Sequence, residues 1–382
     1  MKKFFAILLM ICTIFSFNMV TKAQDDTQKT VEYIAQNWID VQFSGEAEVS
    51  QIVVLFNSEG QFIGHLVSFE KNNVPAGYIV LSHEEQGHPI IEYALEGESI
   101  YNYLKDQFAA NRSRIVAERQ SLTESNNVSS FSIFEDVLYT DFINYSLKIE
   151  YDNEIMLYNQ YNQVQTFSKT INISEIAPSS DTFYDDYITL PTDEGSKQFV
   201  NIPGANEIHA LVMGEMPGVI EGEGNCGPTS LANTIKLYAE FKLNNNSSAL
   251  TDLKLNDSDD DTYKELVKIS GYTCASPASM STLVSSIKTY ATQQGYSCST
   301  DDYRYDYWSD FTRDINAHKP ILLYTSSKAG TAHSQVVVGH RMYDNGAKYL
   351  RILSGWTCYP TFVKFKPSSL NNFNGYCVSI WK

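Results

Sequence analysis

A single cysteine stands where a helix is expected to begin in the C-terminal half of the chain. Cys226 lies in the glycine-rich segment GEGNCGPTS, residues 222–230, and Pro228 suits the first turn of a helix. The helix is predicted by apolar residues at helical spacing: Leu231, Ile235, Tyr238 and Phe241. Because N–H groups at a helix N-terminus stabilise an anion, we expect the pKa of this thiol to be lowered and its thiolate to be a nucleophile. The alternative is a small buried residue at the start of a helix.

A cysteine nucleophile needs a base, which is normally a histidine. Among the seven histidines, His333 opens a predicted apolar strand in the same half of the chain as Cys226. Its side chain can therefore face a cleft while the strand holds it rigidly. His340 follows seven residues later, so it has the opposite strand face and is expected to be structural.

The elements that must position these residues follow an α+β plan over residues 199–382, with helices first and an antiparallel sheet afterwards. Periodicity predicts helices near 226–241, 279–293 and 308–318, then strands at 321–325, 333–338, 349–353, 361–365 and 376–381. The turn Asp344-Asn345-Gly346 predicts a hairpin between two of these strands. The Asn/Asp-rich stretch 244–261 is expected to be a long surface loop.

A second, small α+β unit is predicted over residues 24–122. Its expected elements are a helix near 30–37, strands at 50–56, 62–69 and 77–81, and a helix over 100–121. Residues 123–198 are interpreted as an extension of this unit followed by an acidic, exposed linker over 177–198 that a protease could reach. Whether residues 123–175 belong to the first unit is left open by their pattern.

Composition and charge limit the function classes. The chain has 382 residues and a net charge of −17, which disfavours nucleic acid as a partner because the phosphate backbone would be repelled. With 43% apolar and 13% aromatic residues, the chain can form real hydrophobic cores.

The first 23 residues are interpreted as a cleaved secretory signal. Lys2 and Lys3 precede the mostly apolar run Phe4 to Val20, and the small residues Thr21 and Ala23 suit a signal-peptidase site. The alternative is an uncleaved membrane anchor. The signal predicts a secreted or cell-envelope-associated protein without a membrane partner after its removal.

One of the six cysteines, Cys12, lies in the predicted signal, and the remaining five carry a second expectation. An exported chain with an odd number suggests bridges plus one free thiol, and the local pairings would be Cys274–Cys298 and Cys358–Cys377, with Cys226 left over. All five could equally be buried thiols. The sequence has no CxxC and no Cys/His cluster at zinc spacing, so we predict neither a metal nor another cofactor.

Three segments of the C-terminal half resemble papain-like cysteine peptidases of bacteria, especially the double-glycine-peptidase type and streptopain. They are NCGPTS at 225–230, AHSQVVVGH at 332–340 and YLRILSGW at 349–356. Two N-terminal segments, VPAGYIVLS at 74–82 and PIIEYA at 89–94, resemble the inhibitory pro-domain of streptopain. The resemblance implies a papain-like domain over 199–382 behind a streptopain-like pro-domain over 24–122.

The resemblance also implies roles, with two departures from the family pattern. Cys226 would be the nucleophile and His333 the base, but the position that usually holds Asp or Asn is Ser354, whose hydroxyl could accept the imidazole N–H. The oxyanion-hole Gln is missing from residues 216–225, which leaves Asn225 and the Cys226 backbone N–H as donors.

The sequence therefore predicts a secreted cysteine peptidase made as a zymogen, with a peptide or protein substrate and its own pro-domain as an intramolecular inhibitor. The departures at Ser354 and at the missing Gln keep an alternative open, a catalytically silent papain-like module that binds or inhibits. A third interpretation retains the Cys/His chemistry as an acyl transferase or amidase.

Overall fold

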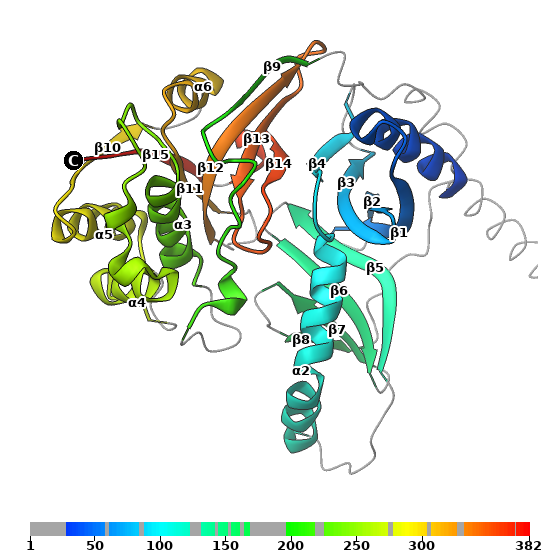
Figure 1. Ribbon diagram of the computed structural model, residues 1–382. Coiled ribbons are helices and arrows are strands. Elements are labelled where there is room, and N and C mark those ends of the chain that lie inside the picture. Colours follow the sequence, from blue (N-terminus) through cyan, green and yellow to red (C-terminus); the bar gives the residue numbers. More distant parts are fainter. Residues whose placement is uncertain are drawn as a thin grey trace, which may run out of the picture.

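The computed structural model describes most of the chain after residue 27 (Figure 1). The described residues are 28–57, 61–83, 88–122, 131–141, 144–151, 154–160, 164–168, 196–217, 225–273, 278–303, 307–326, 332–370 and 372–382. The predicted signal and most of the predicted linker lie outside them. Among the helices that are described, none is long and apolar enough to cross a membrane.

The N-terminal unit is a helix packed on an antiparallel sheet. The helix covers residues 28–43, and the strands are β1 (Glu48–Phe56), β2 (Phe62–Lys71), β3 (Val74–Ser82) and β4 (Ile90–Ala94), paired in sequence order. Both faces of β3 are buried: Ile79 and Leu81 pack with Trp38 of the helix, while Tyr78 and Val80 belong to a second cluster on the other face. This two-sided burial explains why the strand is an unbroken apolar run.

The second cluster is covered by α2 (Ile100–Leu122) and by a four-stranded extension. The extension consists of β5 (Phe131–Asp141), β6 (Asn144–Tyr151), β7 (Glu154–Asn159) and β8 (Val164–Ser168). β5 pairs in parallel with β1, so the extension continues the same sheet. The sequence left open whether residues 123–175 belong to the first unit. The described part of that range continues the sheet of that unit.

The C-terminal unit places helices against an antiparallel sheet. The helices are α3 (Cys226–Glu240), α4 (Asp259–Ser270), α5 (Met280–Gln293) and α6 (Trp308–Asn316). The strands are β9 (Ser196–Asn201), β10 (Ser297–Tyr303), β11 (Ile321–Ser326), β12 (Ala332–Tyr343), β13 (Lys348–Leu353), β14 (Thr361–Lys364) and β15 (Asn372–Trp381), in the order β10-β15-β11-β12-β13-β14 with β9 beside β12. α3 packs against β11 and β12. The chain as a whole is therefore a mixed α/β protein with a large mixed sheet.

Two expectations for this unit need correction. The stretch 244–261 is not simply a loop, because it contains two short 3₁₀ turns and the first turn of α4. β9 begins at Ser196, inside the range interpreted as linker, and pairs with β12. The hairpin predicted at Asp344-Asn345-Gly346 is confirmed, since β12 and β13 pair antiparallel on either side of it.

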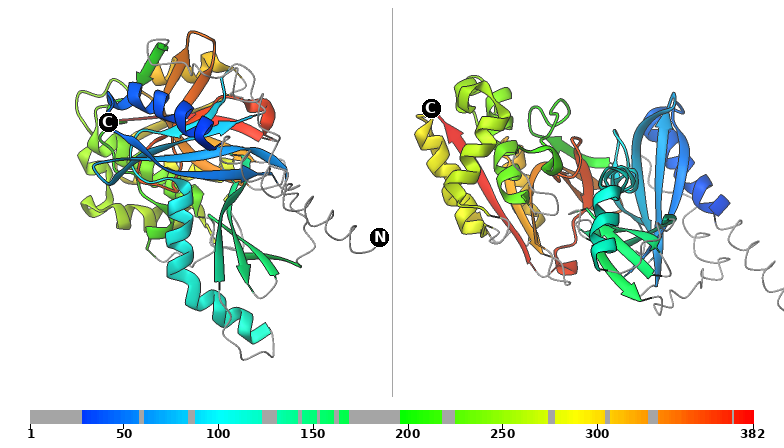
Figure 2. Two further views of the ribbon diagram at one scale, coloured as in Figure 1. Left: turned by 90° about the vertical axis from the view of Figure 1, so that its right-hand side faces the viewer. Right: turned by 90° about the horizontal axis from the view of Figure 1, so that it is seen from below.

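The two units share one sheet at a single strand pair. β4 of the N-terminal unit runs antiparallel to β14, with Tyr93 opposite Phe362 and Glu92 opposite Val363. The rings of Tyr93 and Phe362 stack with centroids 4.5 Å apart. The view from below in Figure 2 shows the N-terminal unit lying against this side of the C-terminal sheet.

Candidate active site

Cys226 is the first residue of α3, as the sequence predicted. Asn225 precedes the helix, and its carbonyl accepts the N–H of Thr229 at 3.1 Å to close the first turn. Gly227 is buried, and a Cβ there would lie 2.9 Å from Leu283 Cδ2 of α5. The glycine thus allows α3 and α5 to pack closely.

The thiol of Cys226 is half-buried and surrounded by backbone donors. Burial raises its pKa above the ordinary value, although the N–H groups of Ser334, Gly227 and Cys226 itself oppose the rise. The expected lowering of the pKa is therefore wrong for this form of the protein. The donors are in place, but the cost of desolvating a thiolate is larger than their stabilisation.

His333 is fully buried on β12 and is held in one orientation. Its ring stacks on Trp356 with centroids 4.5 Å apart and an 11° interplanar angle. Nε2 lies 2.6 Å from the backbone oxygen of Ser354. A carbonyl only accepts, so Nε2 carries the hydrogen, and Nδ1 carries the lone pair that a general base needs.

Burial also sets the charge state of this imidazole. It lowers the pKa of His333 to about 4, and the hydrogen bond to Ser354 only partly opposes the shift. In this form the thiol and the imidazole are both neutral near pH 7. Nδ1 is buried and has no hydrogen-bond partner among the residues that the structure describes.

The structure brings Cys226 and His333 to one place through the residue after the histidine. The Ser334 hydroxyl lies 2.8 Å from the Ser230 hydroxyl on α3, and the backbone N–H of Ser334 helps to lower the pKa of the Cys226 thiol. These contacts fix β12 against the first turn of α3. His340, the histidine that was predicted to be structural, packs against α6, where its ring lies 5.4 Å from that of Trp308.

Ser354 orients His333 through its backbone, which differs from the hydroxyl contact expected from the sequence. Its Oγ accepts the N–H of Trp356 at 3.2 Å, while its carbonyl holds the imidazole. Gly355 between them has a φ of +80°, a conformation that glycine adopts without steric cost. The tight turn lets Trp356 fold back over the histidine.

Asn225 is close to the nucleophile, but its amide hydrogens are engaged. Nδ2 donates to the Met213 carbonyl and to the Tyr263 hydroxyl, each at 3.0 Å. Oδ1 is buried and has no partner in the described part of the chain, and as a carbonyl oxygen it can only accept. The oxyanion role predicted for Asn225 stays a prediction, and it would require one of these two contacts to open.

The N-terminal unit covers the site. Cys226, Met213 and Trp356 pack in the same apolar cluster as Ile100 and Tyr103 at the start of α2. This contact contributes to the burial of Cys226, while the ring of Trp356 covers that of His333.

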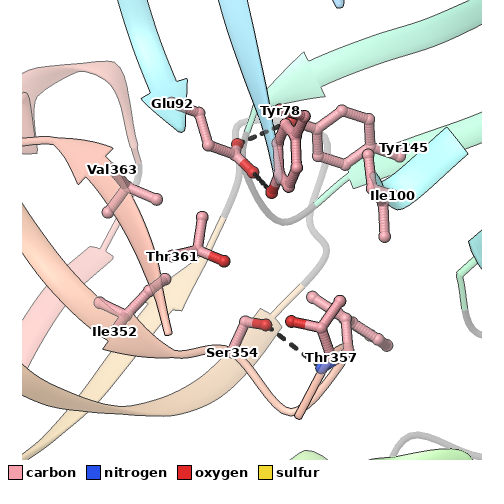
Figure 3. Close-up of a pocket in the computed structure, with 10 residues that line it drawn as sticks. Tyr78, Glu92, Ile100, Tyr145, Ile352, Ser354, Thr357, Thr361 and Val363 are labelled. Carbon is pink, nitrogen blue, oxygen red and sulfur yellow. Dashed lines mark hydrogen bonds between the residues drawn. The ribbon is translucent and has the colours of Figure 1, made fainter. Parts of the chain in front are cut away.

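A small cavity of about 10 Å³ lies between the two units, large enough for about one water molecule. Figure 3 shows the carboxylate of Glu92 beside it, accepting hydrogen bonds from Tyr78 at 2.5 Å and Tyr145 at 2.6 Å. Ser354 and Thr361 line the cavity from the other unit. This polar group was not expected from the sequence, where its one signal is an acidic residue inside the apolar strand IIEYA.

The described cysteines are thiols. The free thiols are Cys226, Cys298, Cys358 and Cys377. The predicted pairing Cys358–Cys377 is therefore wrong. Cys298 is also unpaired, and its expected partner Cys274 lies outside the described residues. Within the described ranges, no three His, Cys, Asp or Glu side chains are grouped to hold a metal ion.

Comparisons with known proteins give little. No family model matches the chain, and no curated protein matches it in sequence. Among solved structures, a mutant fragment of prointerpain A from Prevotella intermedia aligns over 86% of this chain and 98% of its own, with a TM-score of 0.38 and 9% identity. At that level the similarity carries no conclusion about the function of this chain.

Proposed function

We propose that this chain is the zymogen of a cysteine peptidase with a papain-like C-terminal domain, whose nucleophile is Cys226 and whose base is His333. The observation that carries the proposal is a thiol at the start of α3 together with an imidazole on β12, the strand that Ser334 ties to α3. Among the described residues, the Nδ1 lone pair of this imidazole has no partner. A hydrogen bond at Nε2 and a stacked tryptophan fix that imidazole, as an orienting group does in a catalytic triad.

The reaction follows from these positions. Nδ1 of His333 takes the proton of the Cys226 thiol, and the sulfur forms a bond to the scissile carbonyl carbon while the carbonyl π electrons move to oxygen. Collapse of this intermediate breaks the C–N bond, and the imidazolium returns its proton to the leaving amine. Water, deprotonated by the same imidazole, then hydrolyses the thioester and restores the thiol.

The N-terminal unit would act as an inhibitor that prevents catalysis by Cys226 and His333. It packs with Cys226 and with Trp356, whose ring covers His333. Burial raises the thiol pKa and lowers the imidazole pKa, so the reactive thiolate is disfavoured. Cleavage in the linker would release the unit. We further propose that residues 1–23 are removed as a secretory signal and that the mature protein acts outside the cytoplasm on peptides or proteins.

The test uses the full chain with a site-specific protease sequence placed within residues 177–190. After the linker is cut, the wild type is expected to hydrolyse peptides, Cys226→Ala to be inactive, and Cys298→Ala to match the wild type. Cys298 is the control because it is another half-buried thiol. A cut wild type that neither cleaves peptides nor reacts selectively with iodoacetamide at Cys226 would overturn the proposal.

The second candidate is a silent papain-like binding module. The pKa directions of Cys226 and His333 favour it, because in this form neither group is charged for catalysis. In that case the alkylation rate of Cys226 would rise only above the raised thiol pKa, even after the linker is cut. The zymogen proposal instead expects a rise at neutral pH once the cover is removed.

A further inference from the structure

The proposed chemistry needs a second hydrogen-bond donor for the oxyanion. Stabilising the negative oxygen of a tetrahedral intermediate normally takes two preorganised donors. The Cys226 backbone N–H can be one of them. The side chain of Asn225 supplies no free hydrogen, because both of its amide hydrogens are already donated to Met213 and Tyr263.

Tyr263 carries a hydrogen-bond donor next to the Asn225 side chain. Its hydroxyl accepts from Asn225 Nδ2 at 3.0 Å, and a phenol that accepts one hydrogen bond still has its own O–H to give. Within the part of the chain that the structure describes, no group accepts that hydrogen. The Cys226 thiolate would raise the pKa of Tyr263, in addition to the larger effect of burial, so the hydroxyl remains protonated beside the nucleophile.

The hydroxyl is held by a rigid support. Tyr263 is only 3% exposed, and its ring packs in the main core of the C-terminal unit. Its helix, α4, is capped by Ser258, whose Oγ accepts the N–H of Asp261 at 3.2 Å. Asp259 in the first turn is tied to α3 by Lys236 at 2.7 Å. A donor fixed in this way needs no reorganisation when charge develops.

We propose that the Tyr263 hydroxyl is the second oxyanion donor, in the role that the missing Gln would have, and that Asn225 is the positioning residue that fixes it. The inference rests on the proposed function. No proton leaves Tyr263 in this step: the S–C bond forms, the carbonyl electrons move to oxygen, and the O–H hydrogen bond to that oxygen shortens.

The test is Tyr263→Phe in the full chain with the cleavable linker, after cutting. The kcat for a peptide amide is expected to fall by about 10²–10³-fold, the loss typical of removing one oxyanion donor, while KM changes little. Binding of a peptide aldehyde should weaken in parallel, because its adduct with the thiol carries the same oxygen. Alkylation of Cys226 by iodoacetamide should stay at the wild-type rate, since that displacement creates no oxyanion.

Tyr290→Phe is the matched control. Tyr290 is also buried in the helical layer, but its hydroxyl donates to the Leu253 carbonyl at 2.9 Å, so its loss should leave kcat unchanged. A Tyr263→Phe variant with wild-type kcat overturns the inference while leaving the peptidase intact. A parallel loss of alkylation would show a structural role and also overturn it. If the cut wild type lacks both activity and selective alkylation, the proposed function fails, and this inference fails with it.

Discussion

The backbone oxygen of Ser354 lies 2.6 Å from Nε2 of His333, and this contact orients the imidazole without any carboxylate or amide side chain. Such a carbonyl fixes the tautomer as a side chain would. It supplies no full negative charge to stabilise the imidazolium. A serine at this position can therefore orient the imidazole through its backbone alone.

Replacing the serine hydroxyl should have a small effect on catalysis. In Ser354→Ala the carbonyl remains, so kcat/KM of the cut chain should stay within about tenfold of wild type, equivalent to about 1.4 kcal/mol. The lost hydrogen bond to the Trp356 N–H should lower the free energy of unfolding by about 0.5–1.5 kcal/mol. Steady-state kinetics and urea unfolding measure the two effects. A much larger loss of activity would assign the orienting role to the hydroxyl.

The stacked pair Tyr93 and Phe362 should hold the N-terminal unit on the C-terminal unit. Tyr93→Ala removes the stack and the hydrogen bond from Arg341, so we expect a loss of stability of about 3–5 kcal/mol. Faster alkylation of Cys226 in the uncut chain should accompany it. Tyr33→Ala is the control, because that tyrosine is 57% exposed. Equal alkylation rates in the two variants would show that this junction does not govern access.

Acid should destabilise the uncut protein. Burial lowers the pKa of His65, His88, His333 and His340 to about 4, from an ordinary value of 6.5. Between these values the unfolded chain binds more protons than the folded chain, so folding stability is fully present above pH 6.5 and falls as the pH drops towards 4.

Urea unfolding at pH 7.5 and pH 5 measures this dependence. The free energy of unfolding is expected to be lower at pH 5. His333→Gln removes one of the titrating groups and should reduce the difference between the two pH values. A wild type that is equally stable at both would contradict the proposed neutral state of these histidines.

The cysteines should differ in reactivity. Burial raises the pKa of Cys298 to about 11 and that of Cys377 to about 12, so both should stay protonated and unreactive in the folded chain. A thiol reagent followed by peptide mapping should label them only after denaturation, without prior reduction. A disulfide at Cys298, Cys358 or Cys377 in the purified protein would contradict the structure.

Local patterns predicted much of the fold. The apolar spacing after Cys226 predicts α3, and the Asp344-Asn345-Gly346 turn predicts the β12–β13 hairpin. α4 was missed because its first turn, Asp259–Asp261, is as polar as a loop. Ser258 followed by acidic residues is nevertheless a typical helix start.

The site was predictable only in part. Cys226 and His333 could be named because their residue types are rare and chemically specific. The role of the Ser354 carbonyl could not be predicted, because every residue has a backbone carbonyl and only the turn at Gly355 directs this one towards His333. The engaged amide of Asn225 depends on Tyr263, which comes from another helix, so no local pattern contains it. The raised pKa of the thiol likewise depends on burial by a distant segment.

The most direct test of the central claim is to trap the acyl-enzyme. The linker-cut full chain is mixed with a peptide p-nitrophenyl ester, quenched in acid within a single turnover and mapped by mass spectrometry. Cys226 as nucleophile predicts an acyl group on the peptide that contains Cys226 in the wild type, and none in Cys226→Ala. An unmodified Cys226, or an acyl group on Cys298 or Cys358 instead, would contradict the claim.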